Sequence, residues 1–217
     1  MYPPHIFKEN GYIKVENFIT KDMADYLYTY VKQTALNTAL LHEMYGQEIW
    51  DKVGGFIGIF NDPQAFGDYS RYGDPTFDSL LQHKMSKVEK ITGLQLTPTY
   101  TYHRLYTTET ELVRHKDRPS CEISTTLCLG YDSDYNWPMF VSKEDGGQGE
   151  PIYLNPGDMI IYRGCEIEHW REPFKGLNHA QVFFHYNEKN GEYDIPFDGR
   201  PNLGLPIESV LDKKLKW

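Results

Sequence analysis

The feature that most constrains the fold is a succession of short β-type segments in the second half of the chain. Each segment is rich in β-branched and aromatic residues, and turn signals such as Glu-Asp-Gly-Gly and Asn-Pro-Gly-Asp separate them. The segments cover residues 96–106, 121–129, 150–154, 158–163 and 180–186. Closely spaced strands of this kind predict a small β-sandwich or jelly roll.

The first half of the chain has helical periodicity after a predicted strand at residues 11–18. Thr20 is suited to cap a first helix, and Asp74 with Pro75 is suited to begin a second helix that ends at Gly93. The predicted buried stripe of the first helix is Met23, Leu27, Tyr30, Val31 and Thr34. That of the second is Phe77, Leu80, Leu81, Met85, Val88 and Ile91. Helices followed by strands predict an α+β chain.

The length of 217 residues fits a single domain. We expect residues 1–94 to form a strand-helix support region, residues 95–187 the β core and residues 188–217 a tail, which closes with an amphipathic segment at 207–215. The glycine-rich stretch 54–60 lacks the Gly-Lys-Ser/Thr of a phosphate-binding loop, so we interpret it as a strand or loop beside the core.

Composition narrows the class of partner. The net charge of −9 argues against a nucleic-acid backbone as the main partner, because phosphate binding needs a basic face. The chain has no signal-peptide pattern and no apolar run near the ~20 residues of a membrane span. Cys121, Cys128 and Cys165 are odd in number and lack zinc-type spacing. We therefore expect a cytoplasmic protein with reduced thiols and no membrane partner.

Three residues form a candidate metal-binding set. His115 and Asp117 lie two positions apart near the end of a strand-like segment, and His169 follows another apolar strand and a short loop. Two imidazoles and a carboxylate on one face of a metal leave the opposite face open, as in non-haem Fe(II) oxygenases. Zinc prefers a tetrahedral site with one open position, so a zinc-dependent hydrolase is the alternative on ligand type alone.

The sequence around these residues resembles the prolyl-hydroxylase-like branch of the 2-oxoglutarate/Fe(II)-dependent dioxygenases. Leu-Val-Arg-His-Lys-Asp-Arg-Pro is similar to that branch's Tyr-Val-Arg-His-x-Asp-Asn-Pro block, and Gly146-Gly147, Pro156-Gly157-Asp158 and His169 followed by Pro173 recur in the family's order. The resemblance covers residues 95–187. It implies a double-stranded β-helix (jelly-roll, cupin-like) core with N-terminal support helices.

The resemblance also implies an activity. It makes the chain an Fe(II)- and 2-oxoglutarate-dependent dioxygenase with His115, Asp117 and His169 as catalytic metal ligands. Such an enzyme uses dioxygen and 2-oxoglutarate to hydroxylate a C–H bond. The substrate would be a small molecule or a peptide, for example a prolyl residue or a free amino acid. The branch that demethylates nucleic acids is disfavoured by the acidic charge.

The chain departs from the family at the cosubstrate site. The family places Arg or Lys on the strand after the distal histidine, to pair with the distal carboxylate of 2-oxoglutarate, and here that position is His179. His179 itself, a nearby cation (Arg171, Lys175 or Arg104) or a different cosubstrate would each account for the change. Tyr106 matches a family tyrosine whose hydroxyl contacts the cosubstrate, although an ordinary sheet tyrosine is an equal alternative.

Other residues are candidates by position only. Glu166 or Glu168 is a candidate hydrogen-bond partner of a ligating imidazole, and Arg118, Trp137 and Trp170 are candidates for the substrate rim. A non-catalytic cupin-like module that binds a metal or ligand is the alternative from another functional class. The absence of Arg or Lys at position 179 is the feature that favours this alternative.

Overall fold

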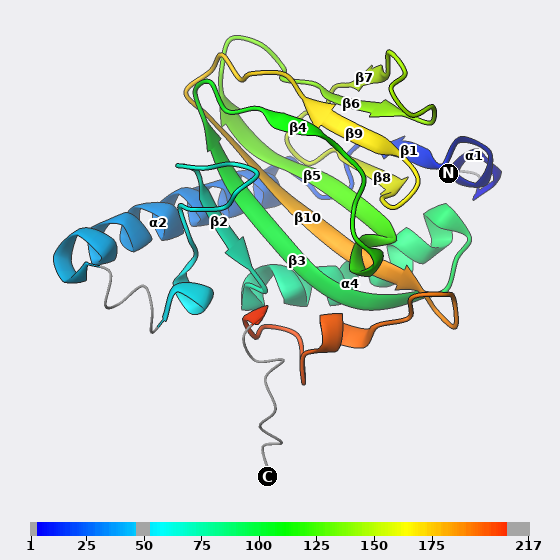
Figure 1. Ribbon diagram of the computed structural model, residues 1–217, viewed down its shortest axis with the longest axis horizontal. Coiled ribbons are helices and arrows are strands. Elements are labelled where there is room, and N and C mark those ends of the chain that lie inside the picture. The colour runs from blue at the N-terminus through cyan, green and yellow to red at the C-terminus, as the bar shows by residue number, and fades with distance from the viewer. Residues whose placement is uncertain (1–3, 47–52, 208–217) are drawn as a thin grey trace.

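Two antiparallel β-sheets face each other in the computed structural model, which describes residues 4–46 and 53–207 (Figure 1). The larger sheet contains, in spatial order, β1 (Tyr12–Val15), β8 (Met159–Arg163), β5 (Ile123–Asp132), β10 (Asn178–Glu188), β3 (Leu96–Thr107) and β2 (Tyr69–Tyr72). The smaller sheet contains β4 (Leu112–His115), β9 (Glu168–Arg171), β6 (Met139–Ser142) and β7 (Glu150–Ile152). The predicted α+β chain with a jelly-roll core is confirmed.

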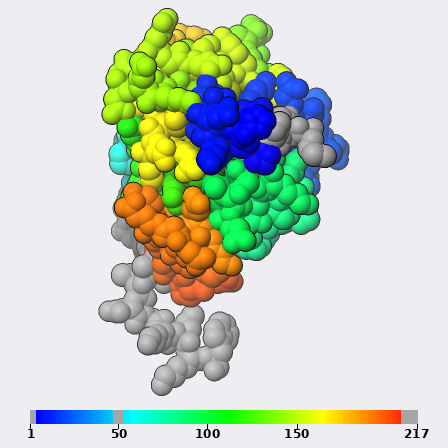
Figure 2. Space-filling model, turned by 90° about the vertical axis from the view of Figure 1, so that its right-hand side faces the viewer, coloured from blue at the N-terminus to red at the C-terminus, as the bar shows by residue number. Residues whose placement is uncertain are grey.

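Helices cover the face of the larger sheet that points away from the smaller sheet (Figure 1). They are α1 (Pro4–Asn10), α2 (Lys21–Tyr45) and α4 (Pro75–Thr92), and two 3₁₀ turns lie at η1 (Pro119–Cys121) and η2 (Pro196–Gly199). In Figure 2, α1 (dark blue) lies on the surface between α4 (green) and the yellow residues around β9. The apolar core lies between these helices and the larger sheet.

The predicted helix ends are confirmed by their capping hydrogen bonds. Thr20 Oγ1 accepts from the backbone N–H of Met23 at 3.2 Å, and Asp74 Oδ1 accepts from that of Thr76 at 2.8 Å. Gly93 ends α4 in the left-handed conformation at φ 76°. The predicted stripe of α2 is partly wrong, because Met23 is 38% exposed. The buried positions of α2 are Ala24, Leu27, Val31, Ala35 and Thr38.

Short strands account for most of the differences from the sequence prediction. β2, β4, β6 and β9 have four residues each and were not among the predicted segments, whereas the equally short β1 and the three-residue β7 were predicted. Residues 53–57 are helical, and Ile59 forms a bridge with Ser70. Strands β1 and β2 join the larger sheet from the predicted support region. The predicted amphipathic segment 207–215 lies outside the described residues after Ile207.

One buried carboxylate in α4 fastens the segment after β10 to the larger sheet. Asp78, which is 1% exposed, accepts from Thr101 N at 2.9 Å, from Gly204 N at 2.7 Å and from Arg200 Nη1 at 3.2 Å. We expect Asp78→Ala to lower the free energy of unfolding by about 3–5 kcal/mol, because the Arg200 guanidinium would stay buried without its partner. Urea denaturation measures this change.

The matched control is Asp25→Ala. Asp25 forms an exposed ion pair with Lys21, and exposed pairs contribute little to stability. If both substitutions changed the free energy of unfolding equally, the assigned role of Asp78 would be wrong.

Candidate metal centre and adjoining cavity

The structure brings His115, Asp117 and His169 together at one point between the two sheets. β4 ends at His115, whose partner in the register with β9 is His169. The potential ligand atoms of the three residues lie within 4.8 Å of one another. Asp117 Oδ1 is 3.5 Å from His169 Nε2 and 3.8 Å from His115 Nε2. Strand register therefore produces the arrangement that the sequence spacing indicated.

Backbone carbonyls fix the orientation of both imidazoles. His115 Nδ1 is 2.7 Å from Val113 O, and His169 Nδ1 is 3.0 Å from Ile167 O. A carbonyl oxygen only accepts hydrogen bonds, so each Nδ1 carries a hydrogen and each Nε2 is the ring nitrogen left for a metal. This is the hydrogen-bonding pattern expected of metal-ligating histidines.

The two glutamates considered as imidazole partners have other contacts. Glu168 accepts from Arg114 at 3.0 Å and from Gly146 N at 2.8 Å, and Glu166 pairs with Arg163 at 3.5 Å. The prediction that either one orients an imidazole is therefore wrong. Carbonyls two residues before each histidine fill that role, and these contacts depend on backbone conformation, which the residue types do not reveal.

The second oxygen of Asp117 is held from inside the larger sheet. Ser124 Oγ donates to Asp117 Oδ2 at 2.6 Å, and His185 Nδ1 donates to Ser124 Oγ at 2.9 Å. This chain leaves Oδ1 facing the two imidazoles. The sequence analysis did not find Ser124 or His185, because the pairing of β5 with β10 brings them together.

Neighbouring groups keep the Asp117 carboxylate ionised. Burial opposes ionisation, but the neighbouring His169 and the Ser124 hydroxyl hold the pKa of Asp117 well below its usual range. Burial disfavours a charged His169, yet Asp117 raises the pKa of that imidazole above its usual value. Burial and the neighbouring His169 lower the pKa of His115. A metal cation would take the place of the proton between Asp117 and His169.

Because Gly164 has no side chain, the Asp117 carboxylate can pack directly against it. A Cβ at this position would overlap Cys121 O and Asp117 Oδ2, and it would lie 2.8 Å from Ser124 Oγ. We expect Gly164→Ala to displace the carboxylate and to weaken metal binding by about 10–100-fold, as the loss of a ligand's supporting contacts does. Calorimetric titration with Mn(II) measures the affinity. A correctly folded variant with unchanged affinity would contradict this role for Gly164.

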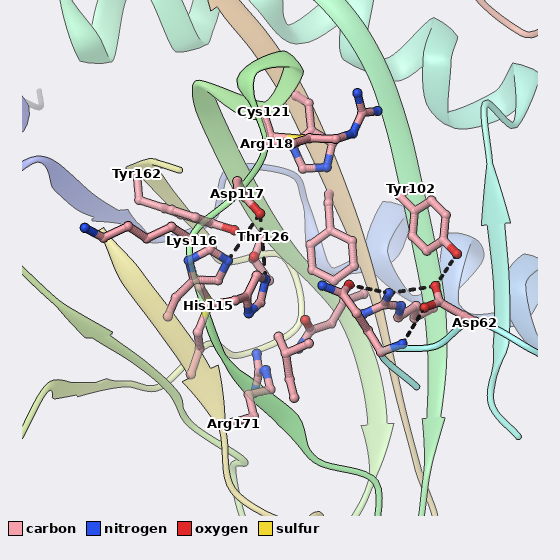
Figure 3. Close-up of a pocket in the computed structure, with 18 of the residues that line it drawn as sticks. Asp62, Tyr102, His115, Lys116, Asp117, Arg118, Cys121, Thr126, Tyr162 and Arg171 are labelled. Atoms are coloured by element: carbon pink, nitrogen blue, oxygen red, sulfur yellow. Dashed lines mark hydrogen bonds and ion pairs between the residues drawn. The ribbon is translucent and has the colours of Figure 1, made fainter. Parts of the chain in front are cut away.

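A cavity of about 360 Å³ opens beside the three groups (Figure 3). Asp117 and His115 lie on one side of it, Asp62 and Tyr102 lie on the opposite side, and Arg171 lies below them in this view. Tyr100 and Phe183 add further aromatic rings to its lining. The cavity therefore joins a potential metal site to a charged wall.

Arg171 is a buried cation in this cavity. It is 3% exposed, its Nη1 donates to Trp137 O at 2.6 Å, and its guanidinium lies 4.5 Å from the centre of the Trp137 ring. Within the described residues no carboxylate forms an ion pair with it. Burial lowers the pKa of Arg171 to about 10, so it remains charged at neutral pH.

The other candidate cations are placed differently. Arg104 lines the cavity but pairs with Asp62 at 2.7 Å. Lys175 lies at the surface, where its Nζ is 3.0 Å from Glu109 Oε2, and it does not line the cavity. Arg118 lines the cavity edge.

His179 is buried and neutral. Burial, followed by the charge of Arg171, holds the pKa of His179 well below its usual range. Its Nε2 accepts from Gln181 Nε2 at 2.8 Å, and its ring stacks on Tyr131. Neither His179 nor the fully buried Tyr106 is among the residues that line the cavity. The cavity lining therefore contains no charged His179 that could bind a carboxylate.

The two tryptophans considered for the substrate rim pack elsewhere. Trp137 is 2% exposed and lies against Arg171. Trp170 lies between the Arg114 guanidinium, 3.5 Å from its ring centre, and the Phe140 ring, 5.4 Å away. Several lining residues were not predicted from the sequence, among them Asp62, whose loop position gives no periodic signal that would identify it.

Solved structures of 2-oxoglutarate/Fe(II) oxygenases have folds similar to that of this chain. No protein-family model and no curated protein matches the sequence. A prolyl-4-hydroxylase from Pseudomonas putida is 13% identical, with 85% of this chain and 96% of that chain covered at a TM-score of 0.59. EctD from S. alaskensis is 14% identical, with 98% of this chain and 85% of that chain covered at a TM-score of 0.63. HygX from Streptomyces hygroscopicus, bound to nickel, 2-oxoglutarate and hygromycin B, is 11% identical, with 85% of each chain covered at 0.59.

The chain thus has the double-stranded β-helix fold of the prolyl hydroxylases and other 2-oxoglutarate/Fe(II) oxygenases. Among the described residues, no helix combines the length and hydropathy that crossing a membrane requires.

Proposed function

We propose that this protein is an Fe(II)- and 2-oxoglutarate-dependent oxygenase that hydroxylates a C–H bond of a small-molecule or peptide substrate. The observation that carries the proposal is the convergence of His115 Nε2, His169 Nε2 and Asp117 Oδ1 beside a cavity that also holds the buried Arg171. Two neutral nitrogen donors and one carboxylate suit Fe(II), with the remaining coordination positions toward the cavity open.

The donor set fits the metal, and the cavity fits the cosubstrate. His115, Asp117 and His169 would hold Fe(II), and Arg171 would bind the distal carboxylate of 2-oxoglutarate by charge-assisted hydrogen bonds. Burial makes the guanidinium costly without an anion nearby, and a carboxylate in the cavity would supply the missing partner. The net charge of a divalent metal, Asp117 and Arg171 balances the two negative charges of 2-oxoglutarate.

The protein itself would position the metal ligands and exclude water from the cavity. When bound, Fe(II) with dioxygen and 2-oxoglutarate supplies the oxidising equivalents, so that R–H becomes R–OH while 2-oxoglutarate becomes succinate and CO₂. The hydrogen bonds from His115 and His169 to backbone carbonyls keep both Nε2 atoms aimed at the metal position. Ser124 holds Asp117 Oδ2, which leaves Oδ1 as the ligand atom. The apolar side chains of Leu112, Met139 and Phe183 limit water in the cavity.

The test is succinate formation by the purified protein with Fe(II), 2-oxoglutarate and dioxygen, without added substrate. With ascorbate added as the two-electron reductant that takes the place of a substrate C–H bond, we expect succinate that requires Fe(II), 2-oxoglutarate and dioxygen and is lost when Zn(II) replaces Fe(II). Metal and 2-oxoglutarate binding without succinate formation would instead identify the cupin-like binding module.

A further inference from the structure

We propose that the substrate is a free α-amino acid, held as its zwitterion by Asp62 and Arg104 and hydroxylated on its side chain. This inference rests on the proposed oxygenase function and adds the substrate class. It starts from the charges that remain in the cavity once Asp117 and Arg171 are assigned to the metal and to 2-oxoglutarate.

Every other charged residue that lines the cavity has an ion-pair partner. The pairs are Arg104 with Asp62 at 2.7 Å, Lys116 with Asp145 at 2.6 Å and Arg118 with Asp198 at 2.6 Å. The cavity therefore presents no net charge to a substrate. A strongly anionic or cationic substrate would leave its own charge uncompensated in a poorly hydrated space, which is costly. A substrate with zero net charge fits.

The pair of Asp62 and Arg104 differs from the other two because both partners are buried. Their side chains are 8% and 5% exposed, whereas Lys116 is 37% exposed and Arg118 48% exposed. Buried ion pairs are weak contributors to stability, because desolvation offsets their attraction. A pair that lines a cavity beside a reactive centre has a second use, as a recognition group with both signs of charge side by side.

Both partners have hydrogen-bonding capacity left. Arg104 Nη2 donates to Asp62 Oδ2 and to Gln64 Oε1, but Nη1 makes only a long 3.4 Å contact with Tyr106 OH. Among the described residues, Asp62 Oδ1 accepts only from Gln64 N at 2.8 Å, and a carboxylate oxygen has two lone pairs. An α-carboxylate on Arg104 Nη1 and an α-ammonium on Asp62 Oδ1 would use these positions. The two groups of an amino acid share one carbon, which matches two charges in contact.

Strand register determines which part of the amino acid would reach the metal. Along β3 and β10 the inward rows are Arg104 with Gln181, then Tyr102 with Phe183, then Tyr100 with His185. His185 is linked through Ser124 to Asp117, so the Tyr100–His185 row is the one next to the metal site, whereas Tyr102 belongs to the Asp62–Arg104 wall, where its hydroxyl donates to Asp62 Oδ2. A substrate side chain directed from the Asp62–Arg104 wall toward the Tyr100–His185 row would approach the centre, while the α-carbon would stay at the wall. We therefore expect side chains of several carbons to be preferred over those of Gly and Ala.

The first experiment tests the substrate class. The twenty free L-α-amino acids are added singly to the protein with Fe(II) and 2-oxoglutarate, and succinate formation is measured. Binding is measured separately by calorimetry on the protein loaded with Mn(II) and 2-oxoglutarate without oxygen. We expect at least one amino acid with a long side chain to bind and to stimulate succinate formation. Its N-acetyl and amide forms should each bind about tenfold or more weakly, because each has lost one charged contact.

Three outcomes would overturn the proposal: no free amino acid binds, the blocked forms bind equally well, or a peptide with internal proline stimulates turnover while free amino acids do not. Succinate formed without any substrate reports the oxygenase function separately, so each hypothesis can fail alone.

The second experiment uses Asp62→Asn, with Asp25→Asn as the control at the exposed pair with Lys21. The readout is the ratio of affinities for the active amino acid and for its des-amino analogue, the same carboxylic acid without the ammonium. Asp62→Asn should reduce this ratio by about tenfold, and Asp25→Asn should leave it unchanged. Damage to the fold would weaken binding of both ligands equally, so it could not produce the expected fall in the ratio. An unchanged ratio in Asp62→Asn would reject the role assigned to Asp62.

Discussion

Replacing Asp117 with alanine is expected to abolish succinate formation and to weaken Fe(II) binding more than the roughly 10–100-fold that loss of a ligand's supporting partner costs. Asp117 would supply the anionic ligand of the set, and its Oδ1 lies 3.5 Å from His169 Nε2 and 3.8 Å from His115 Nε2. Metal affinity is measured by calorimetry with Mn(II), and turnover is measured by succinate release with saturating Fe(II).

Ser124→Ala provides a graded comparison for the same carboxylate. It removes the hydroxyl that donates to Asp117 Oδ2 at 2.6 Å but leaves the ligand atom in place. We expect Ser124→Ala to weaken metal binding by about 10–100-fold, less than Asp117→Ala does. Circular dichroism confirms that each variant is folded. If Asp117→Ala bound metal as the unmodified protein does, the proposed ligand set would be wrong.

The parts of this structure that could be predicted are those with a local physical cause. Thr20, Asp74 and Gly93 mark helix ends because each makes its capping contact within the helix that it begins or ends. The three metal-site residues were identified from their types, from the two-residue spacing of His115 and Asp117, and from resemblance to a family. Their convergence in space is what the β4–β9 register adds.

The parts that could not be predicted depend on contacts between distant segments. Ser124 meets His185 only because β5 and β10 pair in one register, and Asp62 reaches Arg104 from a loop 42 positions away. One signal was present for Arg104. It alternates with Tyr102 and Tyr106 on one face of β3, and a charged residue on an otherwise aromatic face indicates a wall that is not simply core.

The position proposed for the cosubstrate cation differs from the one that family spacing indicated. Family spacing selected position 179, yet among the described residues the lining guanidinium without a carboxylate partner belongs to Arg171 on β9. The two side chains are electrostatic neighbours, because the charge of Arg171 helps to keep His179 neutral. The proposed cosubstrate cation is therefore on β9 of the smaller sheet, whereas position 179 is on β10 of the larger sheet.

Arg171→Met is therefore expected to raise the KM for 2-oxoglutarate by about 30-fold or more, because a buried carboxylate would lose its charged partner at a cost of about 2–5 kcal/mol. Methionine keeps much of the length and apolar character of the side chain. Mn(II) affinity without 2-oxoglutarate should change little, because Arg171 is not among the metal-ligand candidates. This combination separates loss of cosubstrate binding from general damage to the site.

Two further variants complete the test of the cosubstrate site. Lys175→Met removes a surface cation paired with Glu109, so it should leave the KM for 2-oxoglutarate unchanged. His179→Gln keeps a polar side chain at the position where the resemblance places the cation. If Arg171→Met left this KM unchanged while His179→Gln raised it, the carboxylate would belong to His179, and the role given to Arg171 would have to be abandoned. The expected order places the large effect on Arg171, because His179 is neutral and already accepts a hydrogen bond from Gln181.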